Sequence, residues 1–553
     1  MKQLAWAVAV FAAAALTYLP SVRYEFVSHD DHEYAYWNPN VLGGLSVSNV
    51  YWAVTSCGYA CNWHPLAWTS LQLDASIAHA NPVEKGDPHD PPLRRLASVM
   101  HAHNVVLHAA NAALLFLLIV FMRRRLGSDG DVALPVATLF ALVWAIHPLR
   151  TEVVCWVSER KEILSVFWML VTLLLWTGGR SAVRVGLAFV CFALALSAKP
   201  VAVSLPVVLL AWDWVMEKRR FGRSLAAVSP FLVLAAGASA LTLAAQTEAV
   251  DVGNQYTAVD KVVMSLTAPV VYLRQTVWPS GLSAFYPWNP PVSWLELGLG
   301  VVLLLGAVGV CAAWLWHRRS PALSLLAFAV AWCHVSLVSM LGIVKVGSQT
   351  HSDRYTYWAG CGAAAVAALA ASRIVRGHQS EMTRGLATVV AALVAATLLR
   401  MPVWRNSYSL YADAVPKSWA VPATQSLCRM LMTRGDEGCR QAERLLRDAL
   451  MQTGDSDIRA EFALLKAVTS VKSEFCLGDK DPAFGEARYE AETVLAALPN
   501  HPVANEALAV VEMNEGKWQS ALRHLEAARK KTADVARIDR SIAFCREKLS
   551  TGK

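Results

Sequence analysis

Two neighbouring carboxylates, Asp30 and Asp31, stand just after the first apolar run of this 553-residue chain. Adjacent carboxylates at the rim of a bilayer are costly unless they are solvated, paired or bound to a cation. The segment continues with histidine, glutamate, tyrosine and tryptophan up to Pro39, a mixture that suits a carbohydrate or headgroup site. We therefore predict a catalytic role for Asp30 and Asp31, in which one of them takes or orients a hydroxyl proton. The alternative is a solvated loop start.

Three later charged groups also lie between apolar runs. Arginine binds phosphate through its planar fork and lysine as a point charge. The alternatives are local ion pairs and, for the lysine before Pro200, a side chain that only reaches the membrane interface. The predicted donor-phosphate site comprises Glu159, Arg160, Lys161, Lys199, Asp353 and Arg354. The predicted substrate-binding residues are Trp63, His64 and Tyr355.

Two groups of polar residues raise the question of a metal. His29 and His32, with the acids Asp30, Asp31 and Glu33, could hold Mg²⁺ or Mn²⁺, and the sequence leaves metal dependence open. A second group recurs at spacings of three and four residues along one apolar run. There, hydrogen bonding between helices is favoured over metal binding. This stripe is His101, Asn104, His108 and Asn111.

Long apolar runs dominate the first four hundred residues, and the whole chain is 55% hydrophobic with a mean hydropathy of +0.36. A membrane-spanning helix needs about 20 apolar residues. The pattern predicts an all-α, polytopic membrane bundle with about eleven spans over residues 1–402. These are 4–20, 102–122, 132–147, 162–178, 181–198, 200–216, 225–245, 294–316, 321–340, 357–373 and 384–402. We expect 259–280 to be a re-entrant or interfacial helix.

The loops between these runs alternate in character. One set is basic, at 123–125, 180–184, 218–220, 318–319 and 373–376, and positive loops mark the cytoplasmic side. We therefore expect a cytoplasmic N-terminus, and chemistry on the outer face of the membrane. A cleaved signal peptide is the alternative for the first run, and a retained helix is favoured. The net charge of +8 follows from the basic loops and contact with membrane lipids, so no nucleic-acid partner is implied.

From residue 403 the apolar runs shorten to helical stripes. The spacing from His501-Pro502 through Gly516-Lys517-Trp518 to Ala527 matches a tetratricopeptide repeat, and a weaker copy surrounds Cys439. We predict a periplasmic, repeat-like helical domain over 403–553 that binds an acceptor protein. An oxidising compartment permits at least one disulfide there, and the candidates are Cys428, Cys439, Cys476 and Cys545.

The order of these motifs resembles a known family. Asp30-Asp31, Asn62-Trp63-His64-Pro65, the His/Asn stripe, Trp156-Val157-Ser158-Glu159-Arg160-Lys161, Ala198-Lys199-Pro200 and Asp353-Arg354-Tyr355, followed by repeats, look like the transmembrane and tetratricopeptide-repeat O-mannosyltransferases. These are GT-C glycosyltransferases. The resemblance implies a polyprenyl-phosphate sugar donor, a base or orienting group at Asp30 or Asp31, and Arg160, Lys199 and Arg354 facing the lipid phosphate.

The expected activity is transfer of a sugar, such as mannose, from a polyprenyl-phosphate donor to a hydroxyl group, on protein by the simplest hypothesis. Transfer to a lipid or polysaccharide is the nearest alternative. A transporter would place ionisable groups near the middle of the bilayer, whereas these cluster at the ends of spans. A scaffold that only displays the repeats would leave the charged clusters unexplained.

Overall fold

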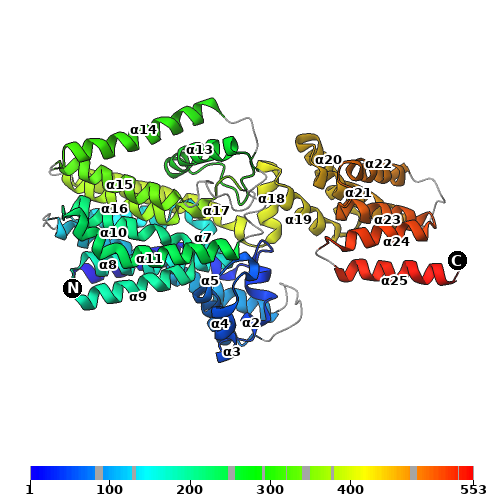
Figure 1. The fold of residues 1–553 in the computed structure, drawn as a ribbon, viewed down its shortest axis with the longest axis horizontal. Helices are drawn as coiled ribbons and strands as arrows, with labels where there is room; N and C mark the ends of the chain where they lie inside the picture. Colours follow the sequence, from blue (N-terminus) through cyan, green and yellow to red (C-terminus); the bar gives the residue numbers. More distant parts are fainter. Residues whose placement is uncertain are drawn as a thin grey trace. The chain divides into compact units, whose positions relative to one another are not determined.

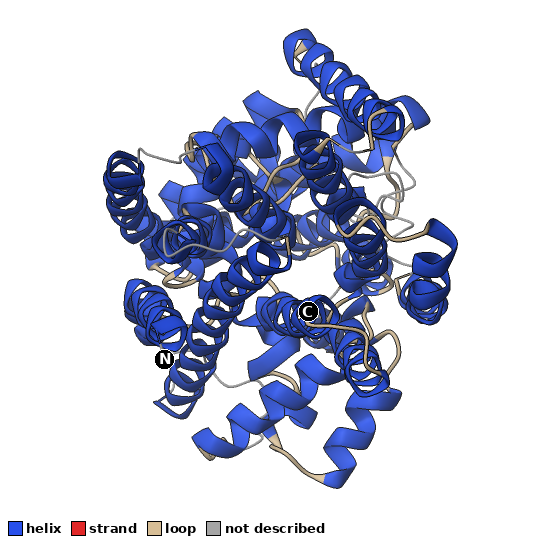
Figure 2. Cartoon of the chain, turned by 90° about the vertical axis from the view of Figure 1, so that its left-hand side faces the viewer, coloured by secondary structure: helices blue, strands red, loops and turns tan. Residues whose placement is uncertain are grey.

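The structure, a computed structural model, describes residues 2–80, 91–126, 133–246, 256–288, 293–318, 320–338, 349–374, 379–473, 482–532 and 535–551. These described residues form helices and connecting turns without a named strand, as Figure 2 shows. The chain divides into two compact units, Met1–Leu410 (unit 1) and Tyr411–Lys553 (unit 2). This division lies close to the domain boundary predicted at residues 402 and 403.

Unit 1 is built from long apolar helices that run side by side (Figure 1). Its long helices are α1 (Lys2–Tyr18), α5 (Pro91–Arg125), α6 (Ala133–Ala145), α8 (Arg160–Thr177), α9 (Ala182–Ala198), α11 (Phe221–Ala245), α13 (Ala258–Val277), α14 (Trp294–Trp316), α15 (Pro321–Val338), α16 (Thr356–Ile374) and α17 (Gln379–Arg400). Shorter helices connect them: α2 (Pro39–Leu42), α3 (Val47–Thr55), α4 (Pro65–Ala78), α7 (Thr151–Cys155) and α10 (Leu205–Ala211). The largest apolar core lies among α5, α6, α8, α9, α10, α15 and α16.

Several of these helices suit a membrane protein. Among the described residues, five are long and apolar enough to cross a bilayer, or six if the bent pair Leu134–Ala145 and Pro148–Cys155 is one span. The five are Lys2–Arg23, Pro91–Arg125, Phe221–Ala245, Trp294–Trp316 and Glu381–Trp404. Shorter apolar helices occupy Ala182–Ala198, Pro200–Met216 and Pro321–Leu337. The total of eleven spans stays a prediction.

The basic loops of unit 1 meet one another. Arg125 Nε lies 3.1 Å from a Glu217 carboxylate oxygen. Arg180 pairs with Asp213, which precedes Glu217 by four residues. The Arg318 guanidinium lies 5.9 Å from the ring centre of Trp214, in the same short segment. We call this the basic end of unit 1. Of the predicted basic residues, Arg319 and Arg376 lie outside the described residues.

A polar stripe on α5 binds its neighbours, as predicted. His108 Nδ1 lies 2.8 Å from the Tyr357 hydroxyl, and the Asn111 side-chain amide donates to the Ile163 carbonyl at 3.0 Å. Asn104 donates to the Trp156 carbonyl at 3.1 Å. These bonds join α5 to α8, α16 and the segment before α8, and they satisfy polar groups that would be costly in an apolar core.

Unit 2 is a succession of neighbouring helices (Figure 1). After α18 (Ser407–Ser418), which crosses the division between the units, come α19 (Val421–Met432), α20 (Gly435–Thr453), α21 (Ser456–Ser473), α22 (Pro482–Ala497), α23 (Pro502–Asn514), α24 (Trp518–Arg529) and α25 (Val535–Thr551). Gly516 makes the turn between α23 and α24 with a φ of 72°, a conformation that glycine adopts without strain. The predicted helix–turn–helix is therefore present, and its assignment to the tetratricopeptide repeats stays a prediction.

The described cysteines are free thiols, including Cys428, Cys439 and Cys545 of the tail. Cys428 and Cys545 are buried, and Cys545 packs in an apolar cluster with Ile538 and Ile542. The predicted bridge is thus absent among these three, because each sulfur lies in its own helical contact. Cys476 lies outside the described residues.

Candidate functional site

Asp31 is a buried carboxylate in the segment that follows α1, which we call the first loop. It ties this loop to the segment before α8. Its Oδ2 accepts a hydrogen bond from the Val27 backbone N–H at 2.9 Å. Its Oδ1 accepts bonds from the Ser158 backbone N–H, at 3.0 Å, and from the Ser158 hydroxyl. Burial raises the pKa of Asp31 to about 7, although these hydrogen bonds oppose the shift. The side chain is thus engaged inside the protein and holds the loop in place.

Asp30 has different surroundings. It is only partly buried, and among the described residues no hydrogen bond or ion pair reaches its carboxylate. Its charge acts on Lys161 and on His29, so it lies within electrostatic range of Lys161, the second residue of α8. Of the two predicted catalytic carboxylates, Asp30 is the one that remains accessible to a ligand.

Three cations and three carboxylates form one buried group beside these acids, which we call the charged cluster. Lys199 Nζ lies 2.8 Å from one oxygen of Glu159 and 2.9 Å from one oxygen of Glu162. Arg354 pairs with Glu152, and its Nε lies 3.6 Å from Glu159. The members are Glu152, Glu159, Lys161, Glu162, Lys199 and Arg354. Three segments that are distant in sequence, at 152–162, 199 and 354, thereby meet at one place.

Lys161 is the most loosely paired cation of the charged cluster. Its Nζ lies 3.7 Å from Glu159, and it stands over the Tyr34 ring, 4.2 Å from the ring centre. A cation over an aromatic face is stabilised without losing its capacity to donate hydrogen bonds. Lys199, by contrast, is held between two carboxylates. Lys161 is therefore the lysine better able to bind an incoming anion.

The electrostatics favour the charged forms of Glu159, Lys199 and Arg354. Burial by itself would raise the pKa of Glu159, but Lys199, Lys161 and Arg354 outweigh burial and lower it to about 2. Burial would lower the pKa of Lys199, but Glu159 and Glu162 raise it above its ordinary value. The pKa of Arg354 is also raised, because Tyr355, Glu152 and Glu159 outweigh its burial. These three groups therefore carry charge at neutral pH, whereas burial raises the pKa of Glu152 and lowers the pKa of Lys161.

Asp353 and its neighbour Arg354 bind different partners. The Tyr286 hydroxyl donates to Asp353 Oδ1 at 2.7 Å, whereas Arg354 binds Glu152. Burial, together with the charge of Glu152, raises the pKa of Asp353 to about 7. Asp353 thus orders the segment around Tyr286 and does not pair with the cations of the charged cluster.

Arg160 points into the protein, apart from the charged cluster. Its Nη2 donates to Asp74 at 2.8 Å and to the Met100 carbonyl at 2.7 Å. Its Nη1 donates to the Ser70 hydroxyl at 2.8 Å, and its Nε binds Asn104. The side chain is fully buried and joins α4, α5 and α8. This geometry gives Arg160 a positioning role, while Lys161 is the cation on which the charge of Asp30 acts.

The predicted substrate-binding aromatics have separate environments. The Trp63 indole donates to the Val54 carbonyl at 2.9 Å, and the ring is partly exposed. His64 is buried, with Nδ1 3.2 Å from the Tyr34 hydroxyl, so it contacts the ring on which Lys161 stands. Tyr355 packs against an apolar group that includes Ala268. The structure brings His64 to the charged cluster and leaves Trp63 and Tyr355 at its margins.

Trp156 is the aromatic centre of the site, although the sequence analysis gave it a place in a motif and no role. His29 stacks on it with ring centres 4.8 Å apart, and the guanidinium of Arg354 lies 5.6 Å from its ring centre. Glu152 and Glu162 were also missed as members of the charged cluster. They stand in the same motif as Glu159, but only the bend between α7 and α8 shows that they face one group of cations.

Across the described residues, no group of three or more histidines, cysteines, aspartates or glutamates is placed to hold a metal ion. In the first loop, Asp31 binds Ser158 and His29 stacks on Trp156. These two side chains are therefore committed to other contacts.

Comparisons with known proteins give the chain no relative by sequence. No family model matches it, and no curated protein is significantly similar to it. Its function therefore has to be argued from the site.

Proposed function

We propose that this protein is a membrane glycosyltransferase that moves a sugar from a polyprenyl-phosphate donor to an acceptor hydroxyl. One observation carries the proposal: Asp30, a carboxylate without a hydrogen-bond or ion-pair partner among the described residues, lies within electrostatic range of Lys161, a cation of the charged cluster. A base and a set of cations are the two parts that such a transfer needs.

In the proposed reaction, Asp30 accepts the proton of the acceptor hydroxyl. The hydroxyl oxygen forms a bond to the anomeric carbon of the sugar, while the bond between that carbon and the phosphate oxygen breaks. The polyprenyl phosphate leaves with the electron pair of that bond. Lys161 and Arg354 stabilise its charge, because a phosphate anion is favoured by cations held in place in a site shielded from water.

The remaining charged residues position these groups. Asp31 fixes the first loop through Ser158, and Lys199 holds Glu159 and Glu162 in place. Arg160 anchors the start of α8, next to Lys161. Preorganised charges of this kind lower the barrier because they need no rearrangement during the reaction.

The proposed location is the outer face of a bacterial inner membrane, with several spans and a cytoplasmic N-terminus. Its support is the separation of charge within unit 1. Arg125, Arg180 and Arg318 belong to the basic end, and α5 carries the chain from Asn104, beside Arg160, to Arg125. That is 21 residues, or about 30 Å of helix, which is the thickness of a bilayer core.

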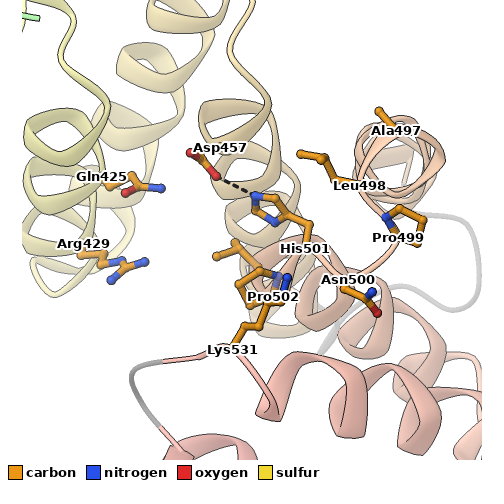
Figure 3. Close-up of a pocket in the computed structure, with 11 residues that line it drawn as sticks. Gln425, Arg429, Asp457, Ala497, Leu498, Pro499, Asn500, His501, Pro502 and Lys531 are labelled. Atoms are coloured by element: carbon orange, nitrogen blue, oxygen red, sulfur yellow. Dashed lines mark hydrogen bonds and ion pairs between the residues drawn. The ribbon is translucent and has the colours of Figure 1, made fainter. Parts of the chain in front are cut away.

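Unit 2 contains a cavity that suits the proposed binding of an acceptor protein. It has a volume of about 500 Å³ and lies among α19, α21, the turn from α22 to α23 and the residue Lys531 after α24 (Figure 3). His501 Nε2 lies 2.6 Å from Asp457 in its wall, and Arg429 and Lys531 supply positive charge. The lining also includes apolar residues such as Leu498 and Val503, and a mixed lining with charges of both signs fits a peptide better than an acyl chain. We propose that this domain recruits the acceptor.

The proposal is tested in cells by mass analysis of glycans. Deletion of the gene should remove one glycan from an envelope protein or polymer, and the intact gene should restore it. A gene carrying Asp30→Asn should not restore it, whereas Arg94→Gln, at an arginine that is 58% exposed, should. An unchanged glycan profile after deletion would contradict the proposal. The mass lost identifies the sugar, and the molecule that loses it identifies the acceptor.

A further inference from the structure

A second cavity lies at the basic end of unit 1, in a part of the molecule that the proposed reaction does not use. It has a volume of about 200 Å³ and lies between α10 with its following turn Trp212–Met216, α14 and α15. We call it the tryptophan groove. Its walls are apolar and include Leu210, Trp214, Val215, Trp314, Leu315 and Ala331.

The polar atom of one wall is turned away from the groove's apolar surface. The Trp314 indole N–H donates to the Ser324 hydroxyl at 3.2 Å, and its ring meets Trp214 edge to face, with centres 4.8 Å apart. α14 is also among the least covered helices of unit 1, and Leu315 is 49% exposed. An apolar groove in such a setting is open to the hydrocarbon of a bilayer.

A cation stands over the same two tryptophans. The Arg318 guanidinium lies 5.9 Å from the ring centre of Trp214 and 5.7 Å from that of Trp314. Among the described residues no carboxylate or carbonyl binds it, so its donors are available. Arginine that follows a span on the basic side lies at the level of the lipid phosphates.

We propose that the tryptophan groove binds an anionic phospholipid, with an acyl chain against the groove's apolar walls and the phosphate at Arg318. The groove supplies apolar contact, and Arg318 supplies charge complementarity. One arginine near a membrane surface favours an anionic lipid by roughly fivefold. This site is separate from the charged cluster, and the proposal does not depend on the proposed reaction.

The test is native mass spectrometry of the full-length protein, released from nanodiscs made with phosphatidylglycerol or with phosphatidylcholine of the same acyl chains. We expect retained phosphatidylglycerol, and an apparent affinity about fivefold weaker in Arg318→Gln. Arg318→Lys should restore much of the binding, because it keeps the charge. Ala331→Phe, which fills the groove, should lower retention of phosphatidylglycerol to a similar extent.

Two controls separate this site from general attraction to the membrane. Arg223→Gln removes an exposed arginine from the N-terminal turn of α11, and Val302→Phe adds an aromatic ring to an exposed position of α14. Both should retain lipid as the unaltered protein does. Equal retention of the two lipids, or an unchanged result for Arg318→Gln, would overturn the proposal. Loss in Arg318→Gln without loss in Ala331→Phe would overturn the assignment of the acyl chain to the groove.

Discussion

Asp30 and Asp31 are identical in chemistry and adjacent in the chain, yet their surroundings give them different roles. Asp31 accepts bonds from Val27 and Ser158 in a buried position, while Asp30 stays available. We expect Asp31→Ala to lower the free energy of unfolding by about 1–3 kcal/mol, because buried donors lose their acceptor. Asp30→Ala should change it by less than about 0.5 kcal/mol. Denaturant unfolding of the purified protein decides, and equal losses would contradict the assignment.

The raised pKa values of Asp31 and Asp353 predict a pH dependence of stability. Each carboxyl keeps its proton up to about pH 7 in the folded protein, whereas the unfolded chain loses it near 3.8. Between these values the folded state binds more protons, so stability falls as pH rises. Glu159, with its lowered pKa, contributes fully above its ordinary value of 4.5 and does not change this window.

We therefore expect these two carboxyls to destabilise the folded protein progressively between pH 5 and pH 8, while buried histidines such as His64, whose pKa burial lowers, act in the opposite direction in the acidic part of this range. Relative to the unaltered protein, the unfolding midpoints of Asp31→Asn and of Asp353→Asn should therefore increase as the pH rises, and that of the double variant should increase most. Thermal unfolding in a series of buffers measures these midpoints. An unchanged dependence of the midpoint on pH in the double variant would show that these two carboxyls are ionised in the folded protein.

At the scale of elements, Arg160 joins α4, α5 and α8 through Asp74, Ser70 and Asn104. Breaking a buried ion pair leaves a charge without a partner, which costs about 3–5 kcal/mol. We expect that loss of unfolding free energy in Arg160→Met. Arg94→Met is the matched control, since the pair of Arg94 with Glu25 at 3.5 Å is exposed and such pairs contribute about 0–1 kcal/mol. Similar losses in both variants would contradict this role.

The helices could be predicted from the sequence because the spacing of polar and apolar residues and the positions of charges are local signals. The spacing of His108 and Asn111 predicted bonds between helices, and these bonds are present. The roles of Arg160 and Trp156 could not be predicted from the sequence, because the burial of a side chain depends on which helices pack together. The same limit applies to Asp30 and Asp31. Ser158 binds Asp31 from 127 residues further along the chain, and the residues next to the two aspartates do not show this.

At the scale of the whole molecule, the alternation of basic and mixed loops predicts the membrane topology. Reporter fusions after residues 125 and 220 should be cytoplasmic, and fusions after residues 90 and 410 should be external. The contacts of Arg125 with Glu217 and of Arg180 with Asp213 already place these loops together in unit 1. A cytoplasmic reporter at 410 would mean that 259–280 spans the membrane, and would put unit 2 on the side opposite to the charged cluster.

The most direct test of the central claim is sugar transfer by the purified full-length protein in nanodiscs, with labelled polyprenyl-phosphate hexose and periplasmic extract as the acceptor source. The unaltered protein should give a labelled product. Asp30→Asn should lower the rate at least about 100-fold, as expected for loss of a general base, while its unfolding midpoint stays near that of the unaltered protein. Arg94→Gln should retain the full rate. Full activity in Asp30→Asn would contradict the account.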